Sequence, residues 1–215
     1  MQQHYKTNWQ QRVGDKWQEL LADDAYTVTG TLKFNKGTMI GSTTARNILN
    51  AYWHKLDRTF FGHPADKSIG IERWIFSEYG SSGNNLHFQF KAKAPIEPYY
   101  FCCIANVMWS KFHQQTSSGI YSWITPTVLK VNSAGYTVKD TRHFKCDAMG
   151  LEASHQNEIF IDTSTFQDSA QAKRIINKVS IEEIIKAQPI VDWQIEQTIK
   201  KINQRQRRAE VQGTR

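Results

Sequence analysis

The stretch IGIERWIFSEYGSSGNNLHFQFK at residues 69–91 decides the fold of this chain. Its two flanks, residues 69–78 and 86–91, are rich in β-branched and aromatic side chains, which favour β-strands. The Gly, Ser and Asn residues at 80–85 between them readily adopt turn conformations. The sequence therefore predicts a β-hairpin of two antiparallel strands.

The second strand of this hairpin sets two polar side chains on one face. Side chains alternate between the faces of a strand, so His87 and Gln89 point the same way while Phe88 faces the core. Glu78 ends the first strand, within cross-strand reach of His87. A carboxylate, an imidazole and an amide oxygen together suit a hard cation and leave room for water and a phosphate. We therefore expect Glu78, His87 and Gln89 to bind Mg²⁺ or Mn²⁺.

The rest of the chain supplies further strands and helices around the hairpin. Residue patterning predicts strands at residues 26–34 and 120–131, and helices at residues 43–61, capped by Ser42 or Thr43, and 99–112. Pro126 cannot donate a ladder hydrogen bond, which places its strand at an edge or a bulge. The order of elements predicts an α+β fold, with a central antiparallel sheet flanked by helices.

The sequence predicts three regions along the chain. Residues 1–24 are a polar N-terminal extension with a short helix near residues 15–21. Residues 25–165 form the α+β domain, and residues 166–215 form a basic helical region. Within the last region, Pro189 is expected to separate two helices.

Composition points to a polyanionic partner inside a cell. Lys and Arg number 27 against 20 Asp and Glu, a net charge of +7. Basic proteins attract nucleic acids because phosphate contacts release condensed counterions. Three cysteines, two of them adjacent, do not suggest a disulfide framework. With no signal-peptide core and no apolar run of roughly 18 residues, we expect no membrane partner and a cytoplasmic location, or the host cytoplasm or nucleus for a viral source.

A second chemical pattern follows in GYTVKD, residues 135–140. Tyr136 and Lys139 are three apart, which makes them neighbours on one face of a short helix. A tyrosine hydroxyl, with a pKa of about 10, attacks a phosphodiester only when the phosphate charge is neutralised, as a divalent cation does. We predict Tyr136 as nucleophile and Lys139 as its helper. Tyr52 and Lys55 share this spacing, but they lie in a long amphipathic helix, and we interpret them as structural.

The segments TLKFN at residues 31–35, HFQ at 87–89 and GYTVKD at 135–140 occur in this order. Together they resemble the motifs of the HUH-type endonuclease domain of rolling-circle replication initiators (Rep proteins) of circular single-stranded DNA viruses and plasmids. The resemblance covers about residues 26–145. It implies a ferredoxin- or RRM-like sheet and an enzyme that nicks and rejoins single-stranded DNA through a 5′-phosphotyrosine intermediate.

The resemblance also assigns roles to residues. It makes Glu78, His87 and Gln89 the metal ligands, with Glu72 as the fallback for the acidic ligand. Tyr136 would be the single nucleophile, with Lys139 as its helper.

The expected partner is single-stranded origin DNA. Single strands are held by basic grooves and stacking aromatic side chains. The candidate DNA-binding residues are Lys33, Asn35, Lys91, Lys93 and Arg142. The chain has no Walker-type phosphate loop, so we expect a separate helicase and the host replication machinery as further partners. This favours a plasmid, phage or mobile element over an animal virus as the source.

Two other functions stay open at this point. An HUH transposase or relaxase of a mobile element would use the same chemistry on a different DNA. A non-catalytic nucleic-acid-binding protein would bind oligonucleotides without a metal and without forming an adduct.

Overall fold

A computed structural model describes residues 2–23, 25–35, 40–79, 86–117, 121–128 and 153–213 of the chain. The strands are β1 (Val28–Leu32), β2 (Arg73–Glu78), β3 (His87–Ala92) and β4 (Trp123–Pro126). The helices are α1 (Gln2–Leu21), α2 (Ser42–Phe61), α3 (Pro98–Ser110), α5 (Ser169–Ile176) and α6 (Ile181–Gly213). Two short 3₁₀ helices, η1 (His63–Lys67) and η3 (Thr163–Phe166), complete the described elements.

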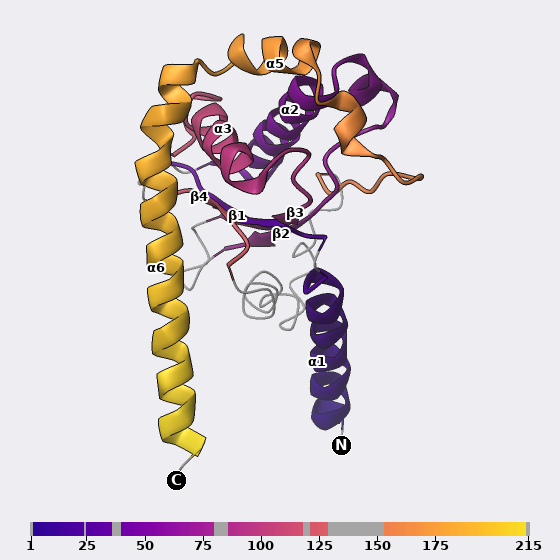
Figure 1. Cartoon of the computed structure of the whole chain (residues 1–215). Helices are drawn as coiled ribbons and strands as arrows, with labels where there is room; N and C mark the ends of the chain where they lie inside the picture. Colours follow the sequence, from indigo (N-terminus) through magenta and orange to yellow (C-terminus); the bar gives the residue numbers. More distant parts are fainter. Residues whose placement is uncertain are drawn as a thin grey trace.

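The four strands form one antiparallel sheet in the order β2-β3-β1-β4. Since β3 lies between β1 and β2, the chain adopts the split β-α-β arrangement of ferredoxin-like domains. The connecting helices α2 and α3 lie on the same face of the sheet (Figure 1). The predicted fold class, α+β with a central antiparallel sheet flanked by helices, is confirmed.

The face of the sheet under α2 and α3 is apolar. Phe88 and Phe90 of β3 are fully buried, and the Trp53 ring of α2 packs edge-on against Phe90 with 5.0 Å between ring centroids. Gly30 of β1 faces the same ring, and a Cβ at this position would overlap it. Only glycine therefore fits there. Phe88 faces the core, as predicted, and Phe90 lies on the same side.

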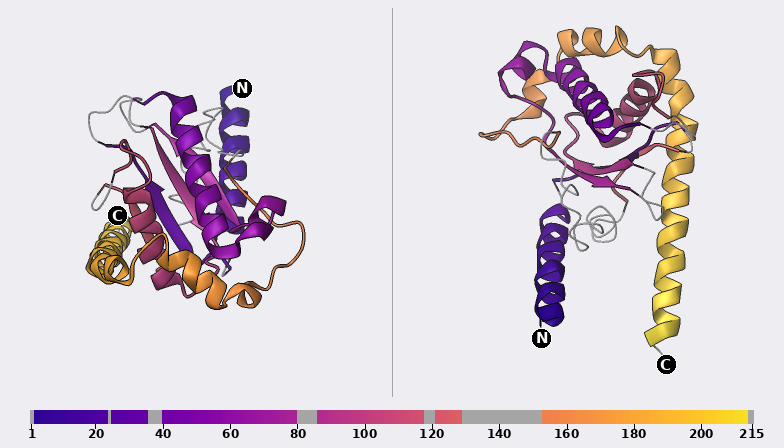
Figure 2. Two further views of the ribbon diagram at one scale, coloured as in Figure 1. Left: turned by 90° about the horizontal axis from the view of Figure 1, so that it is seen from above. Right: turned by 180° about the vertical axis from the view of Figure 1, so that it is seen from behind.

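The opposite face of the sheet carries the polar side chains of β3. The end of α1 packs beside them, where the Trp17 ring lies 4.9 Å from that of Trp74 and 5.5 Å from that of Phe76, between centroids. Figures 1 and 2 show that α1 and α6 both extend away from the sheet on this side. The two long helices therefore flank the polar face.

The C-terminal helices divide at a different place from the predicted one. α6 runs from Ile181 through Pro189, so the predicted break at Pro189 is wrong. The break comes before Ser180, whose Oγ accepts a hydrogen bond from the Glu183 N–H while its own N–H donates to the Glu183 carboxylate. This capping box starts the helix. Packing of α6 against α3 and β4 then offsets the hydrogen bond that Pro189 removes.

Three other helix and strand ends can be compared with the predictions. α1 has 20 residues and begins at Gln2, well before the short helix expected near residues 15–21, because its many Gln, Lys and Arg residues favour helix. Gly41 is the N-cap of α2 and makes no side-chain cap bond, so the predicted capping by Ser42 or Thr43 is wrong. β4 is an edge strand, as Pro126 predicted, but it is shorter than the strand expected at residues 120–131 and ends at that proline.

Candidate functional site

The pairing of β2 with β3 brings Glu78 directly opposite His87. The Nε2 atom of His87 lies 3.1 Å from Oε2 of Glu78. Both residues are buried, with exposed fractions of 4% for His87 and 8% for Glu78. The antiparallel register therefore produces the cross-strand pair that the sequence predicted.

Gln89 completes the group from two residues further along β3. Its Nε2 donates a hydrogen bond of 3.2 Å to the same Oε2 of Glu78. Its Oε1 accepts a hydrogen bond of 2.6 Å from the hydroxyl of Thr31 on β1. Four side chains from three adjacent strands thus form one hydrogen-bonded group: Glu78 contacts His87 and Gln89, and Gln89 contacts Thr31.

This donor set fits a hard divalent cation. Carboxylate oxygen, imidazole nitrogen and amide oxygen are suitable ligands for Mg²⁺ or Mn²⁺. Within the described residues, no three His, Cys, Asp or Glu side chains gather into a metal site. A cation at this place would therefore use the amide oxygen of Gln89 beside one carboxylate and one imidazole.

The alternative acidic ligand, Glu72, lies elsewhere. Its Oε2 is 2.5 Å from Nζ of Lys93, and its Oε1 accepts a hydrogen bond from Asn157. Of the two carboxylates weighed from the sequence, Glu78 is the one beside His87. Lys93, expected near DNA, is paired with Glu72.

The other candidate DNA-binding residues lie in different surroundings. Lys91 is completely buried on the same sheet face as Gln89. Lys33 is half-buried, and its carbonyl accepts a hydrogen bond from the Ser117 hydroxyl. Asn35 is exposed, and its amide donates to the carbonyl of Gln114.

Tyr136, Lys139 and Arg142 lie outside the described residues. The described residues on either side of them are placed at opposite edges of the sheet. Thr127 follows the edge strand β4 and donates its N–H to the carbonyl of Thr27. His155 forms a β-bridge with Arg73 on the outer side of β2.

Tyr52, the other tyrosine with a lysine three residues later, is a core residue. Its side chain is fully buried, and its hydroxyl donates a 2.9 Å hydrogen bond to the carbonyl of Ala105. Burial raises the pKa of Tyr52 well above its usual value. Its interpretation as structural fits these contacts, because a buried neutral phenol in a hydrogen bond cannot reach a DNA phosphate.

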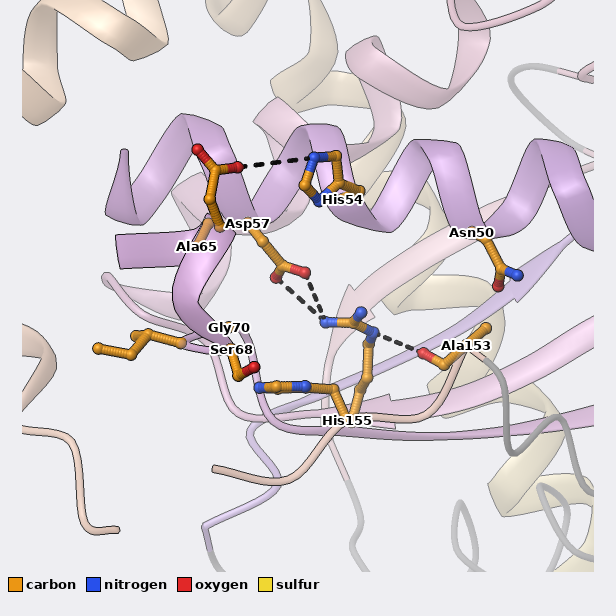
Figure 3. A pocket seen from close by; sticks show the side chains of 11 residues that line it. Asn50, His54, Asp57, Ala65, Ser68, Gly70, Ala153 and His155 are labelled. Carbon is orange, nitrogen blue, oxygen red and sulfur yellow. Dashed lines mark hydrogen bonds and ion pairs between the residues drawn. The ribbon is translucent and has the colours of Figure 1, made fainter. Parts of the chain in front are cut away.

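A separate cavity of about 440 Å³ lies under α2, on the opposite side of the sheet from the Glu78–His87 pair. Figure 3 shows His54 and Asp57 reaching it from α2, with His155 on the facing wall. Its deepest polar groups pair with each other: Nη1 of Arg73 lies 3.1 Å from both carboxylate oxygens of Asp57. Nε of Arg73 donates to the carbonyl of Ala153. Arg73 therefore ties both α2 and the 153–157 segment to β2, which indicates a structural role.

Sequence reasoning missed both Thr31 as a partner of Gln89 and the Asp57–Arg73 pair. Asp57 did carry a signal, since it falls one helical turn after Trp53 on the buried side of α2. A charged residue on an apolar helix face requires a buried partner. The partner itself could not be read from the sequence.

Comparison of the chain with family models, curated proteins and solved structures finds no match. In the described part of the chain, no helix combines the length and the apolar character that crossing a bilayer requires.

Proposed function

We propose that this chain is a metal-dependent endonuclease that nicks and rejoins single-stranded DNA, in the manner of an HUH-type rolling-circle replication initiator. One observation carries the proposal: His87 and Gln89 converge on a single oxygen of Glu78, inside a split β-α-β sheet. A chance His-x-Gln pattern on a wet strand face would not require a buried carboxylate from the neighbouring strand. The three side chains instead supply the ligand types of a cation site.

Tyr136 is the proposed nucleophile, and its role rests on the sequence motif. Its hydroxyl would lose its proton and bond through oxygen to the phosphorus, while the bond from phosphorus to the 3′ oxygen breaks. The departing 3′ oxygen would take up a proton, and Lys139 would steady the phosphate charge. A bound Mg²⁺ or Mn²⁺ supplies further neutralisation of that charge. Reversal of the same exchange rejoins the strand without a nucleotide cofactor.

The edge of the sheet next to this face offers a path for DNA. Trp123 of β4 pairs with Thr31 in the sheet register, and Nζ of Lys201 on α6 lies 4.2 Å from the Trp123 ring centroid. Lys200, beside Lys201, and Arg207, further along α6, are exposed. Aromatic and cationic side chains in this combination are typical of single-strand binding surfaces.

Charge reversal on α6 tests this path. The variant K200E/K201E/R207E is expected to bind single-stranded DNA at least about tenfold more weakly at 0.1 M salt, with a salt dependence of log K shallower by about 2, because three phosphate contacts are lost. The control K173E/K178E/K186E makes the same charge change on α5, on the link after it and at the start of α6. Fluorescence anisotropy measures both, and equal losses in the two variants would show only a net-charge effect.

Cation binding is tested by thermal unfolding with and without Mn²⁺. At a Mn²⁺ concentration 100 times Kd, the wild type is expected to gain about 2.7 kcal/mol of stability by mass action. Glu78→Gln and His87→Ala should abolish this gain. Glu72→Gln, the matched change at the other carboxylate, should retain it. If only Glu72→Gln lost the Mn²⁺-dependent gain in stability, Glu72 would be the acidic ligand instead of Glu78.

The activity itself is tested with a random-sequence library of single-stranded oligonucleotides labelled at the 3′ end. Incubation with the protein and Mn²⁺, followed by a denaturing gel, is expected to shift label to the protein. The sequence of the attached strands then gives the preferred cleavage site, and candidate hairpins supplied as substrates separate a replication origin from a transposon end or a transfer origin. Binding without any adduct would instead identify a non-catalytic nucleic-acid-binding protein.

A further inference from the structure

The Gln89 amide contacts one partner through its oxygen and the other through its nitrogen. Thr31 and Gln89 are paired across β1 and β3, and the Thr31 hydroxyl donates 2.6 Å to Oε1. Nε2 of the same amide donates 3.2 Å to the Glu78 carboxylate. Only 4% of Gln89 is exposed, so water offers little substitute for either partner.

Electrostatics selects this orientation when no cation is present. With the amide reversed, Oε1 would face Oε2 of Glu78, and two acceptors with partial or full negative charge would oppose each other. In the observed orientation, the amide N–H instead donates to Oε2 of Glu78, the same oxygen that His87 contacts. The amide nitrogen thus occupies the position that a cation ligand would need.

A divalent cation demands the opposite orientation. Mg²⁺ and Mn²⁺ bind the oxygen of a glutamine amide, because the amide nitrogen has no free lone pair. A reversed amide would then point Nε2 at Thr31. A threonine hydroxyl has one donor and two acceptor sites, so it can accept this hydrogen bond as well as donate the first. Valine, which has nearly the same shape, can do neither.

We propose that the Gln89 amide turns over when this site takes up a divalent cation, and that the Thr31 hydroxyl is the positioning group that completes both orientations. The inference rests on the cation site of the proposed function. It assigns a chemical reason to the threonine of the TLKFN segment at residues 31–35. Thr31 acts through Gln89 and touches neither substrate nor cation.

Nuclear magnetic resonance with Mg²⁺, which is diamagnetic, tests the turn directly. The Gln89 side-chain NH₂ signal is assigned by its absence in Gln89→Glu. On Mg²⁺ titration, the backbone amides of Glu78 and His87 should shift, and a nuclear Overhauser contact from the Gln89 NH₂ to the Thr31 methyl should gain intensity. Shifts at Glu78 and His87 without that gain overturn the inference and leave the cation site intact. Absence of any Mg²⁺ shift overturns both.

The variants Thr31→Ser and Thr31→Val test whether the Thr31 hydroxyl positions the Gln89 amide or has only a structural role. Without Mg²⁺, the Gln89 NH₂ should exchange with water equally slowly in wild type, Thr31→Ser and Thr31→Val, because Glu78 accepts its hydrogen bond in all three. With Mg²⁺, exchange should become about fivefold to tenfold faster in Thr31→Val than in the other two, because the turned amide has lost its acceptor. Equal exchange in all three Mg²⁺-bound proteins would overturn the proposal. If Thr31→Val fails to fold, the nuclear Overhauser contact from the Gln89 NH₂ to the Thr31 methyl in the wild type tests the proposal instead.

Discussion

Replacing Tyr136 with phenylalanine is expected to abolish the covalent protein–DNA adduct while single-stranded DNA binding stays within a few-fold. Phenylalanine keeps the aromatic ring but lacks the oxygen that would bond to phosphorus. The denaturing gel with 3′-labelled oligonucleotides and Mn²⁺ measures the adduct, and fluorescence anisotropy measures the binding. An adduct that persists in this variant would remove Tyr136 from the mechanism.

Tyr52→Phe is the matched control, since Tyr52 also precedes a lysine by three residues. This change removes only the hydrogen bond to the carbonyl of Ala105 in the core. We expect a loss of about 1 kcal/mol in the free energy of unfolding and an undiminished adduct at a temperature where the variant is folded. An adduct lost in Tyr52→Phe and kept in Tyr136→Phe would exchange the roles of the two tyrosines.

Arg73→Met is expected to lower the free energy of unfolding by about 3–5 kcal/mol. The change leaves the Asp57 carboxylate buried without its partner, and it removes the donors to the carbonyls of Ala153 and Ile71. Urea unfolding at neutral pH measures the loss. Arg58→Met is the control, because the Arg58–Asp66 pair is partly exposed and is expected to contribute less than about 1 kcal/mol.

The buried Asp57–Arg73 pair also predicts how the loss of stability in Arg73→Met changes with a second substitution and with pH. Burial raises the pKa of Asp57 and lowers that of Arg73, so desolvation outweighs their attraction. Asp57→Leu combined with Arg73→Met should therefore be more stable than Arg73→Met alone. A carboxyl group whose pKa is raised on folding favours the folded state most at low pH. That contribution to stability is lost as the pH rises through the pKa of the folded protein. The deficit of Arg73→Met should accordingly narrow in acid, and a deficit that widens would contradict this reading.

Local pattern alone determined the two hairpin strands and the Glu78–His87 pair, which lies where β2 ends and β3 begins. Alternation placed His87 and Gln89 on one face and Phe88 on the other, because a strand repeats every two residues whatever surrounds it. The same regularity carried Glu78 to a position opposite His87, since the two strands are neighbours in sequence. The α+β class followed from the order of elements along the chain. The domain boundaries and the roles of Tyr136, Lys139 and Arg142 stay predictions.

Contacts between distant segments were decided only by the tertiary structure. Thr31 meets Gln89 because β1 inserts between β3 and β4, and no local pattern specifies which strands become neighbours. Asp57 pairs with Arg73 only once α2 lies on the sheet. α6 continues through Pro189 because packing against α3 and β4 outweighs the local preference of one residue. Residue periodicity acts over a few bonds, whereas strand order and buried partners depend on the free energy of the whole packed chain.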